Sequence, residues 1–172
     1  MVEVLRAPDM LLICGGGHIA RDLATMAAQV GFKVWVADPR QEFATRERFP
    51  EAVDVLNMSP AADEVKALVT GNTFVVILTH DHDLDKEALV SLVDTDARYI
   101  GMIGSKRKVK SILKELEVEG VDKGLLDKVH SPIGLDIAAE TSAEIAVSII
   151  GEMIHIKRKG VSSSISMKGG RE

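Results

Sequence analysis

A glycine-rich loop between an apolar run and an amphipathic segment constrains the fold of this chain more than any other feature. Residues 10–14 (MLLIC) are apolar throughout and lead directly into Gly15, Gly16 and Gly17. Apolar residues then recur at helical spacing until Gly31 ends the pattern. A buried strand that passes through a glycine turn into a helix is typical of a βαβ unit on a parallel sheet.

The rest of the sequence repeats this alternation of short apolar runs and helical segments. Strands are predicted at residues 10–14, 33–37, 53–56, 74–79, 98–103 and 128–131, and the last is weak and sits directly before Pro132. A final helix opens with the capping-box pattern of residues 141–144 (TSAE). The sequence therefore predicts an α/β fold, doubly wound around a mostly parallel sheet of about six strands.

Length and composition limit the domain organisation. The 172 residues suffice for one domain but not for a dinucleotide domain with a full substrate domain beside it. We expect a lead-in at residues 1–9, a single domain at residues 10–159 and a flexible tail at residues 160–172, which contains serines and glycines.

Charge and hydropathy exclude several classes of partner. The net charge of -5 gives no general basic field for nucleic acid, and the longest apolar runs are far shorter than a membrane span. The single cysteine, Cys14, excludes an internal disulfide and fits a reducing compartment, where core packing is its expected role. With no leader pattern, we expect a cytoplasmic protein with neither a nucleic-acid nor a membrane partner.

The glycine loop is the first candidate binding site. It has the form G-x-G-x-x-A from Gly15 to Ala20, in which Gly15 permits a tight turn and Gly17 lets the backbone approach a phosphate. The helix that starts near His18 favours an anion at its N-terminus. The alternative is a tight turn without a ligand, since glycine also bends the chain there.

Asp38 and Arg40, at the end of the second predicted strand, are the next candidates. Asp38 lies a little over twenty residues after Gly15, where an acidic side chain accepts hydrogen bonds from a ribose 2′-hydroxyl. Arg40 could instead meet a 2′-phosphate or another anion. A plain turn at Asp38 is equally compatible with the sequence.

His80 and His82 follow the fourth predicted strand and are the candidates for acid–base catalysis. They stand among Asp81, Asp83 and Asp85, a composition that also suits metal ligands, although no second ligand cluster accompanies it and a metal is not predicted. Asp83 is expected to have the structural role of capping a helix at residues 85–93.

A third candidate, Ser105 with Lys106 and Arg107, follows the fifth predicted strand. Ser105 is expected to cap a helix that runs to Leu116, and basic residues in its first turn oppose the helix dipole unless an anion is near. The alternative is a solvated basic face. The apolar loop at residues 132–137 lines a pocket, forms a dimer contact or closes the core.

Several blocks along the chain together resemble the XdhC/CoxI family, the xanthine dehydrogenase accessory proteins. The blocks are ICGGGHIA at residues 13–20, VADPR at 36–40, FATRERFP at 43–50, THDH at 79–82, YIGMIGSKRK at 99–108, PIGLDI at 132–137 and AET at 139–141. The YIGMIGSKRK and PIGLDI blocks are specific, whereas the glycine loop alone is weak.

The resemblance implies a Rossmann-like domain in a protein that helps to mature molybdenum hydroxylases. It implies binding of molybdopterin cofactor, or a related nucleotide, for sulfuration and insertion into the apoenzyme. Many members carry a further N-terminal domain, so we expect here the Rossmann part alone, with contacts to the client or to a sulfur donor supplied by another chain.

Three functions stay open at this point. The first is a cofactor-binding maturation factor, closer to a chaperone than to an independent enzyme. The second is an NAD(P)-dependent oxidoreductase, suggested by the glycine loop and Asp38. The third is a non-catalytic scaffold that docks a molybdenum hydroxylase, and a homodimer is compatible with all three.

Overall fold

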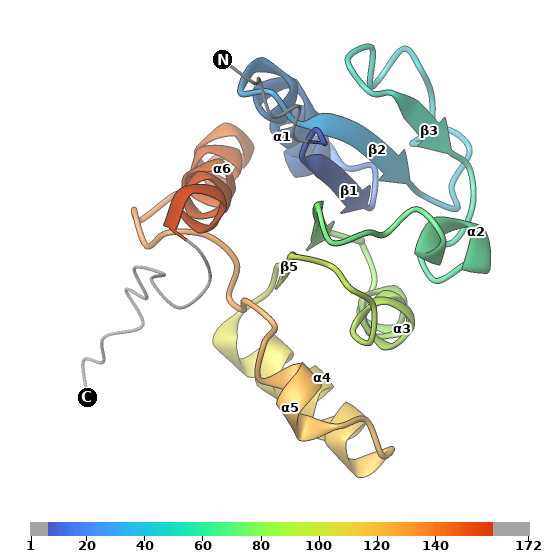
Figure 1. Ribbon diagram of the computed structural model, residues 1–172, viewed down its shortest axis with the longest axis vertical. Helices are drawn as coiled ribbons and strands as arrows, with labels where there is room; N and C mark the ends of the chain where they lie inside the picture. Colours follow the sequence, from blue (N-terminus) through green and yellow to red (C-terminus); the bar gives the residue numbers. More distant parts are fainter. Residues whose placement is uncertain (1–6, 160–172) are drawn as a thin grey trace, which may run out of the picture.

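The computed structural model describes residues 7–159 and contains one parallel sheet of five strands. The strands are β1 (Met10–Cys14), β2 (Lys33–Ala37), β3 (Asp54–Leu56), β4 (Thr73–Ile77) and β5 (Tyr99–Met102). They lie in the order β3-β2-β1-β4-β5, so β1 pairs with both β2 and β4 (Figure 1). This order confirms the predicted doubly wound α/β fold.

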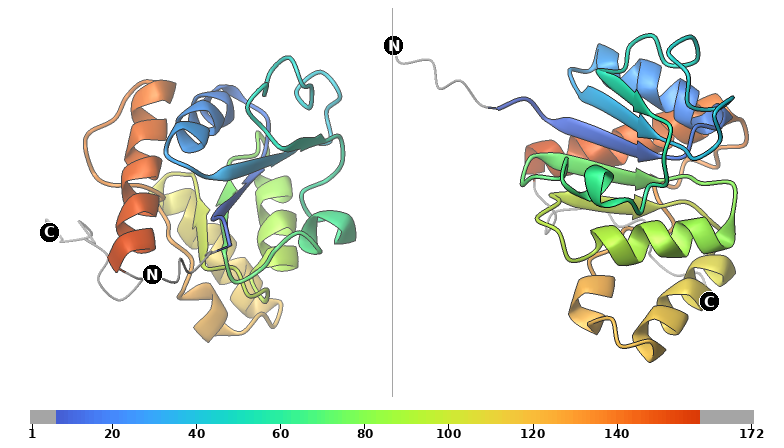
Figure 2. Two further views of the ribbon diagram at one scale, coloured as in Figure 1. Left: turned by 45° about the horizontal axis from the view of Figure 1, so that its top comes forward. Right: turned by 90° about the vertical axis from the view of Figure 1, so that its right-hand side faces the viewer.

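Helices cover both faces of the sheet (Figure 2). They are α1 (His18–Gln29), α2 (Asp63–Lys66), α3 (His82–Leu92), α4 (Lys106–Val118), α5 (Lys123–Leu126) and α6 (Ser142–Lys159). The α1 and α6 helices share one hydrophobic core with the sheet, whereas α3, α4 and α5 share a second core on the other face. All five residues of β4 are buried, which explains why this strand is a continuous apolar run.

The sixth predicted strand is wrong. Of residues 128–131, His130 alone makes a bridge, to Gly101 on the outer edge of β5. The N–H groups of Lys128 and Val129 donate to carbonyls of α5 in a turn, and Pro132 has no N–H group. The segment therefore lacks the donors that a ladder needs.

Helix starts agree with the sequence at α4 and α6 but not at α3. Ser105 caps α4 as predicted, and Thr141 and Glu144 form the predicted capping box of α6. At α3 the cap is Asp81 rather than Asp83, because Asp81 has extended backbone angles and its carboxylate accepts the N–H groups of Asp83 and Leu84. Asp83 already lies inside the helix, which begins three residues earlier than predicted.

Two expectations fall wholly or partly outside the structure. The predicted tail at residues 160–172 and the first six residues of the predicted lead-in lie outside the described residues. Within residues 7–159, no helix is both long and apolar enough to cross a bilayer.

Candidate functional site

The candidate site lies at the carboxyl edge of the sheet, beside the point where the strand order reverses. The chain leaves β1 toward α1 on one face and leaves β4 toward α3 on the other (Figure 1), and in open α/β sheets ligands bind at such a switch point. Every candidate residue named from the sequence follows one of these carboxyl ends: Gly15, Gly16, Gly17 and His18 follow β1, Asp38 and Arg40 follow β2, His80 and His82 follow β4, and Ser105, Lys106 and Arg107 follow β5.

Gly15 and Gly16 are required by the packing of the chain itself. Gly15 has φ +115°, and a Cβ there would lie 2.5 Å from the carbonyl oxygen of Leu78. A Cβ on Gly16 would lie 2.6 Å from the carbonyl oxygen of Phe43. Any side chain at these positions would push into backbone, so the two glycines need no ligand to explain them.

Gly17 has a different environment. Its φ of -74° suits any residue, and no atom beyond its two chain neighbours lies within 4 Å of the place where a Cβ would stand. It is the N-cap residue of α1, a helix with no side-chain cap and no acidic residue in its first turn. The missing side chain thus leaves open space against the N–H groups of a helix start, which is the geometry that an anion needs.

Asp38 joins the glycine loop to the end of β2. Its carboxylate is buried and accepts the N–H of Gly16 at 2.7 Å. It also accepts the backbone N–H of Arg40 at 2.8 Å and two guanidinium N–H groups of Arg40 at 3.0 and 2.8 Å. Burial raises the pKa of Asp38, but the hydrogen bonds from Arg40 and Gly16 and the guanidinium charge outweigh it and hold the pKa below its usual range. This pair therefore stabilises the fold at neutral pH, and its contribution is lost only as the pH falls through that lowered pKa.

Two arginines meet over one aromatic ring beside this pair. The guanidinium carbon of Arg40 lies 3.7 Å from the centre of the Phe43 ring, and that of Arg48 lies 4.9 Å from it. Arg48 Nη2 donates to the carbonyl oxygen of Gly16 at 2.9 Å, while Arg48 Nε is buried without a hydrogen-bond partner among the described residues. An unsatisfied buried donor of this kind is rare in a folded protein.

The sequence interpretation missed the roles of Arg48 and Phe43. Both stood only in the FATRERFP block of the family resemblance. Nothing local marks them, because Arg48 reaches Gly16 across 32 residues of sequence.

On the β5 side, an ion pair between a partly exposed lysine and a buried aspartate occupies the start of α4. Asp85 is fully buried, and its carboxylate accepts the hydroxyl of Thr79 at 2.6 Å and the ammonium of Lys108 at 2.8 Å. Lys108 is thereby directed inward, while Lys106 and Arg107 stay exposed. Cys14 is buried as predicted, and burial together with the charge of Asp85 strongly raises the pKa of its thiol.

The two histidines have different surroundings. His80 is exposed, whereas Nε2 of His82 lies 3.8 Å from a carboxylate oxygen of Glu115 on α4. His82 thus faces the neighbouring helix and does not form a pair with His80. In residues 7–159, no group of three or more histidine, cysteine, aspartate or glutamate side chains is arranged to hold a metal ion.

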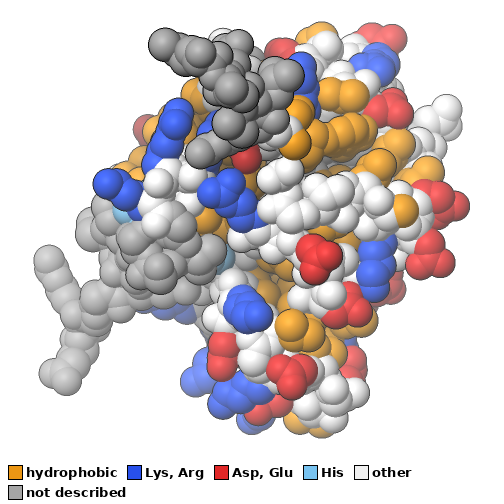
Figure 3. Space-filling view, in the orientation of Figure 1, with side chains coloured by type: hydrophobic (Ala, Val, Ile, Leu, Met, Phe, Trp, Pro, Cys, Tyr) orange, Lys and Arg blue, Asp and Glu red, His pale blue; other side chains and the backbone are white. Residues whose placement is uncertain are grey.

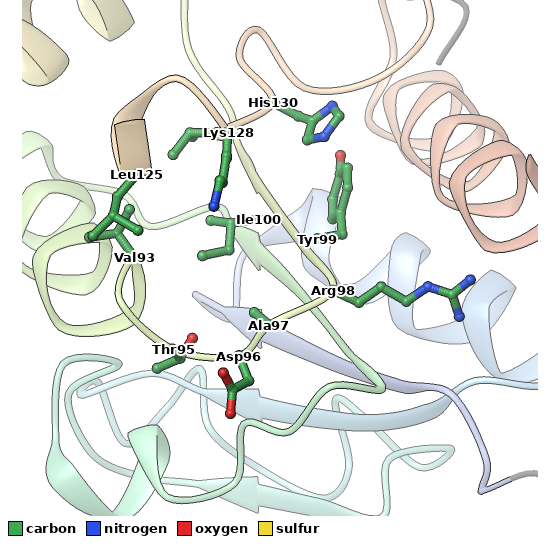
Figure 4. A pocket seen from close by; sticks show the side chains of 11 residues that line it. Val93, Thr95, Asp96, Ala97, Arg98, Tyr99, Ile100, Leu125, Lys128 and His130 are labelled. Atoms are coloured by element: carbon green, nitrogen blue, oxygen red, sulfur yellow. The ribbon is translucent and has the colours of Figure 1, made fainter. Parts of the chain in front are cut away.

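A cavity of about 460 Å³ lies elsewhere, near the start of β5 (Figure 4). Its lining includes Val93, Ile100, Leu125 and Lys128, and the side chain of Lys128 extends toward Ile100. Tyr99 lies at its margin and donates its hydroxyl proton to Glu152 on α6 at 2.6 Å. This cavity is separate from the glycine loop, because β5 begins at the opposite edge of the parallel sheet.

Charges of both signs mix on part of the surface. On the face shown in Figure 3, basic and acidic side chains are interspersed over α4 and α5, at the bottom of the view. On this part of the face there is no broad field of one sign, such as a polyanion would need.

Comparison with known proteins identifies the family. The family model described as the XdhC Rossmann domain matches residues 11–153, which is most of the chain. The chain belongs to the XdhC family. The Rossmann-like fold and the family resemblance noted from the sequence are thereby confirmed.

Two curated relatives contain this XdhC domain within longer chains. The uncharacterized protein YqeB of Escherichia coli K12 is 35% identical over 148 residues, which are 86% of this chain and 27% of YqeB. A probable xanthine dehydrogenase subunit of Bacillus subtilis 168 is 30% identical over 158 residues, 92% of this chain and 46% of that protein. The present chain thus spans less than half the length of either relative.

Two solved structures are similar to this chain. A protein described as a xanthine dehydrogenase from Bacillus halodurans superposes with a TM-score of 0.77 at 34% identity, covering 91% of this chain and 45% of that one. A protein from Lactobacillus casei superposes with a TM-score of 0.56 at 13% identity, covering 85% of this chain and 93% of that one. The second likeness shows a shared fold only.

Proposed function

We propose that this XdhC Rossmann domain serves as an accessory factor of a xanthine dehydrogenase-type molybdenum hydroxylase and holds molybdopterin cofactor during maturation. The cofactor carries a phosphate, and the start of α1 is where the domain would receive it. The names of the relatives from two Bacillus species support a link to xanthine dehydrogenase.

One observation carries the proposal: Gly17 lacks a side chain for no reason internal to the protein. Its backbone angles and the empty space around it would accept most residues, yet the helix it opens has neither cap nor first-turn acid. A phosphate seated there would accept the free N–H groups of α1 and complete the helix start. Arg48 lies beside it, bonded to Gly16 and with a buried N–H still unused.

Other residues at the same edge would contact the remainder of the cofactor. His80 is exposed at the end of β4, the strand next to β1, and would face the pterin or the ligands of the metal. Ser105, Lys106 and Arg107 follow β5, two strands away from β1, which corresponds to roughly 10 Å. A nucleotide form of the cofactor would be long enough to reach them. Sulfuration and insertion would then involve the apoenzyme and a sulfur donor on other chains.

The decisive experiment compares two glycine substitutions by anaerobic calorimetric titration with molybdopterin cofactor. Gly17→Ser places a hydroxyl over the α1 N–H groups, and we expect binding to weaken at least about tenfold because the serine would occupy the anion position. The matched control is Gly71→Ser, since Gly71 also has open space around it but lies before β4 at the opposite edge.

No heat of binding with the unmodified domain would reject cofactor binding, and equal binding by both variants would reject the start of α1 as the site. If an apo-hydroxylase were still captured equally well by the Gly17→Ser variant, the domain would be a docking scaffold instead.

A further inference from the structure

Asp38 has no acceptor capacity left for a ligand. An ionised carboxylate offers about four acceptor positions on its two oxygens. In this structure four donors fill them: the N–H of Gly16, the backbone N–H of Arg40, and Nε and Nη2 of Arg40. With 1% of the Asp38 side chain exposed, a ribose hydroxyl could bind it only after Arg40 had moved away.

Arg40 is held firmly in this position. Its guanidinium forms a bidentate pair with Asp38 and stacks on the Phe43 ring at 3.7 Å. Displacing it would break both contacts and leave a buried carboxylate without its positive partner. The Asp38–Arg40 pair therefore leaves no acceptor for the uncharged hydroxyl groups of a ribose.

The exposed side of Arg40 favours an anionic ligand, whereas Asp38 is closed to a hydroxyl group. Two of the five guanidinium N–H groups are bonded to Asp38, and 26% of the side chain is exposed at the carboxyl edge. The remaining N–H groups can donate to a phosphate without disturbing the pair. Asp38 thus acts as a positioning residue, and Arg40 presents the donors.

We propose that the closed Asp38–Arg40 pair makes this end of the candidate site select a phosphate group over a free ribose hydroxyl, with Arg40 as the specificity-determining residue. This inference rests on the proposed function, because it concerns the ligand class of the same site. It predicts that NAD(H), which carries a free 2′-hydroxyl, is discriminated against at this site.

NAD⁺ and NADP⁺ are the probes, since they differ by a single 2′-phosphate. In calorimetric titrations of the full chain we expect NADP⁺ to bind at least about tenfold more tightly than NAD⁺. In Arg40→Ala the preference should vanish or reverse, because the phosphate loses its donors and Asp38 becomes open to the ribose. Lys33→Ala is the matched control, as it removes one positive charge at the far end of β2, and it should keep the preference.

Circular dichroism establishes that each variant is folded. If Arg40→Ala does not fold, Arg40→Lys replaces it, since lysine keeps the charge but cannot form the two-pronged pair, and the preference should fall.

Three results would overturn the inference: equal or tighter binding of NAD⁺ by the unmodified chain, a preference that survives in the Arg40 variant, or no binding of either nucleotide by the folded chain. None of these depends on the Gly17→Ser titration with molybdopterin cofactor, so failure of the selectivity is distinguishable from failure of the proposed function.

Discussion

The starts of α1 and α4 stand at the same edge of the sheet and follow strands β1 and β5, yet they are built in opposite ways. At α4, Ser105 caps the helix and Lys108 pairs with the buried carboxylate of Asp85. At α1, Gly17 provides no cap and leaves open space. The basic sequence suggested an anion site at α4, but the protein itself satisfies much of that helix start. The start of α1 is therefore the better candidate for an anion site, because no side chain of the protein caps it.

The largest effect on stability is expected at the start of α4, where Lys108 pairs with Asp85. Lys108→Met leaves Asp85 buried without its ammonium partner and should lower the free energy of unfolding by about 3 kcal/mol in urea titrations. Lys110→Met, on the exposed surface of the same helix, is the control and should change little. Equal losses in both variants would show that the pair does not hold α4 in place.

A smaller loss is expected from removing the α4 cap. Ser105→Ala deletes the oxygen that accepts the N–H of Lys108 and should cost about 1 kcal/mol of unfolding free energy. Ser111→Ala, in the middle of the same helix, loses only an exposed hydrogen bond to Glu115 and gains helix propensity, so it should change the stability little. If Ser105→Ala were as stable as the unmodified domain, the two helix starts would be more alike than the structure indicates.

The smallest effect is a gain in stability at the uncapped start of α1. Gly17→Ser supplies the missing cap and restricts the unfolded chain, so the free energy of unfolding should rise by about 0.5 kcal/mol. Stability and cofactor binding would then move in opposite directions, as expected when a residue is kept for a ligand. A variant less stable than the unmodified domain would instead show that the fold itself needs Gly17.

Much of the fold could be predicted because β1, β4 and β5 are almost entirely buried and read as continuous apolar runs. The predicted runs at residues 33–37 and 53–56 also became strands, although β3 at the edge of the sheet is only partly buried. The sixth predicted strand failed because His130 is the end of a turn from α5, and a single-residue bridge has no sequence pattern. The α3 cap was misplaced because Asp81 and Asp83 are chemically identical, and only the backbone conformation tells them apart.

The sequence placed several candidate residues at one edge of the sheet, but it did not show the contacts between them and missed Arg48 and Phe43. The glycine loop, Asp38 and Arg40 were all placed at one edge, because parallel strands end together. The bond from Gly16 to Asp38 spans 22 residues and the bond from Arg48 to Gly16 spans 32, so no local pattern could show that they meet. Nor could the sequence show that Lys108, next to the predicted anion site, turns inward to Asp85.

The packing of α6 on α1 has a consequence for synthesis on the ribosome. Buried residues of α1 share their core with Ala146, Ile149 and Met153 of α6, and Ser142 donates to Asp22 of α1 across 120 residues. At ordinary translation rates, α1 would wait on the order of ten seconds for this partner. During that interval the apolar face of α1 that packs on α6 is uncovered, so this core can close only once the last described helix has emerged.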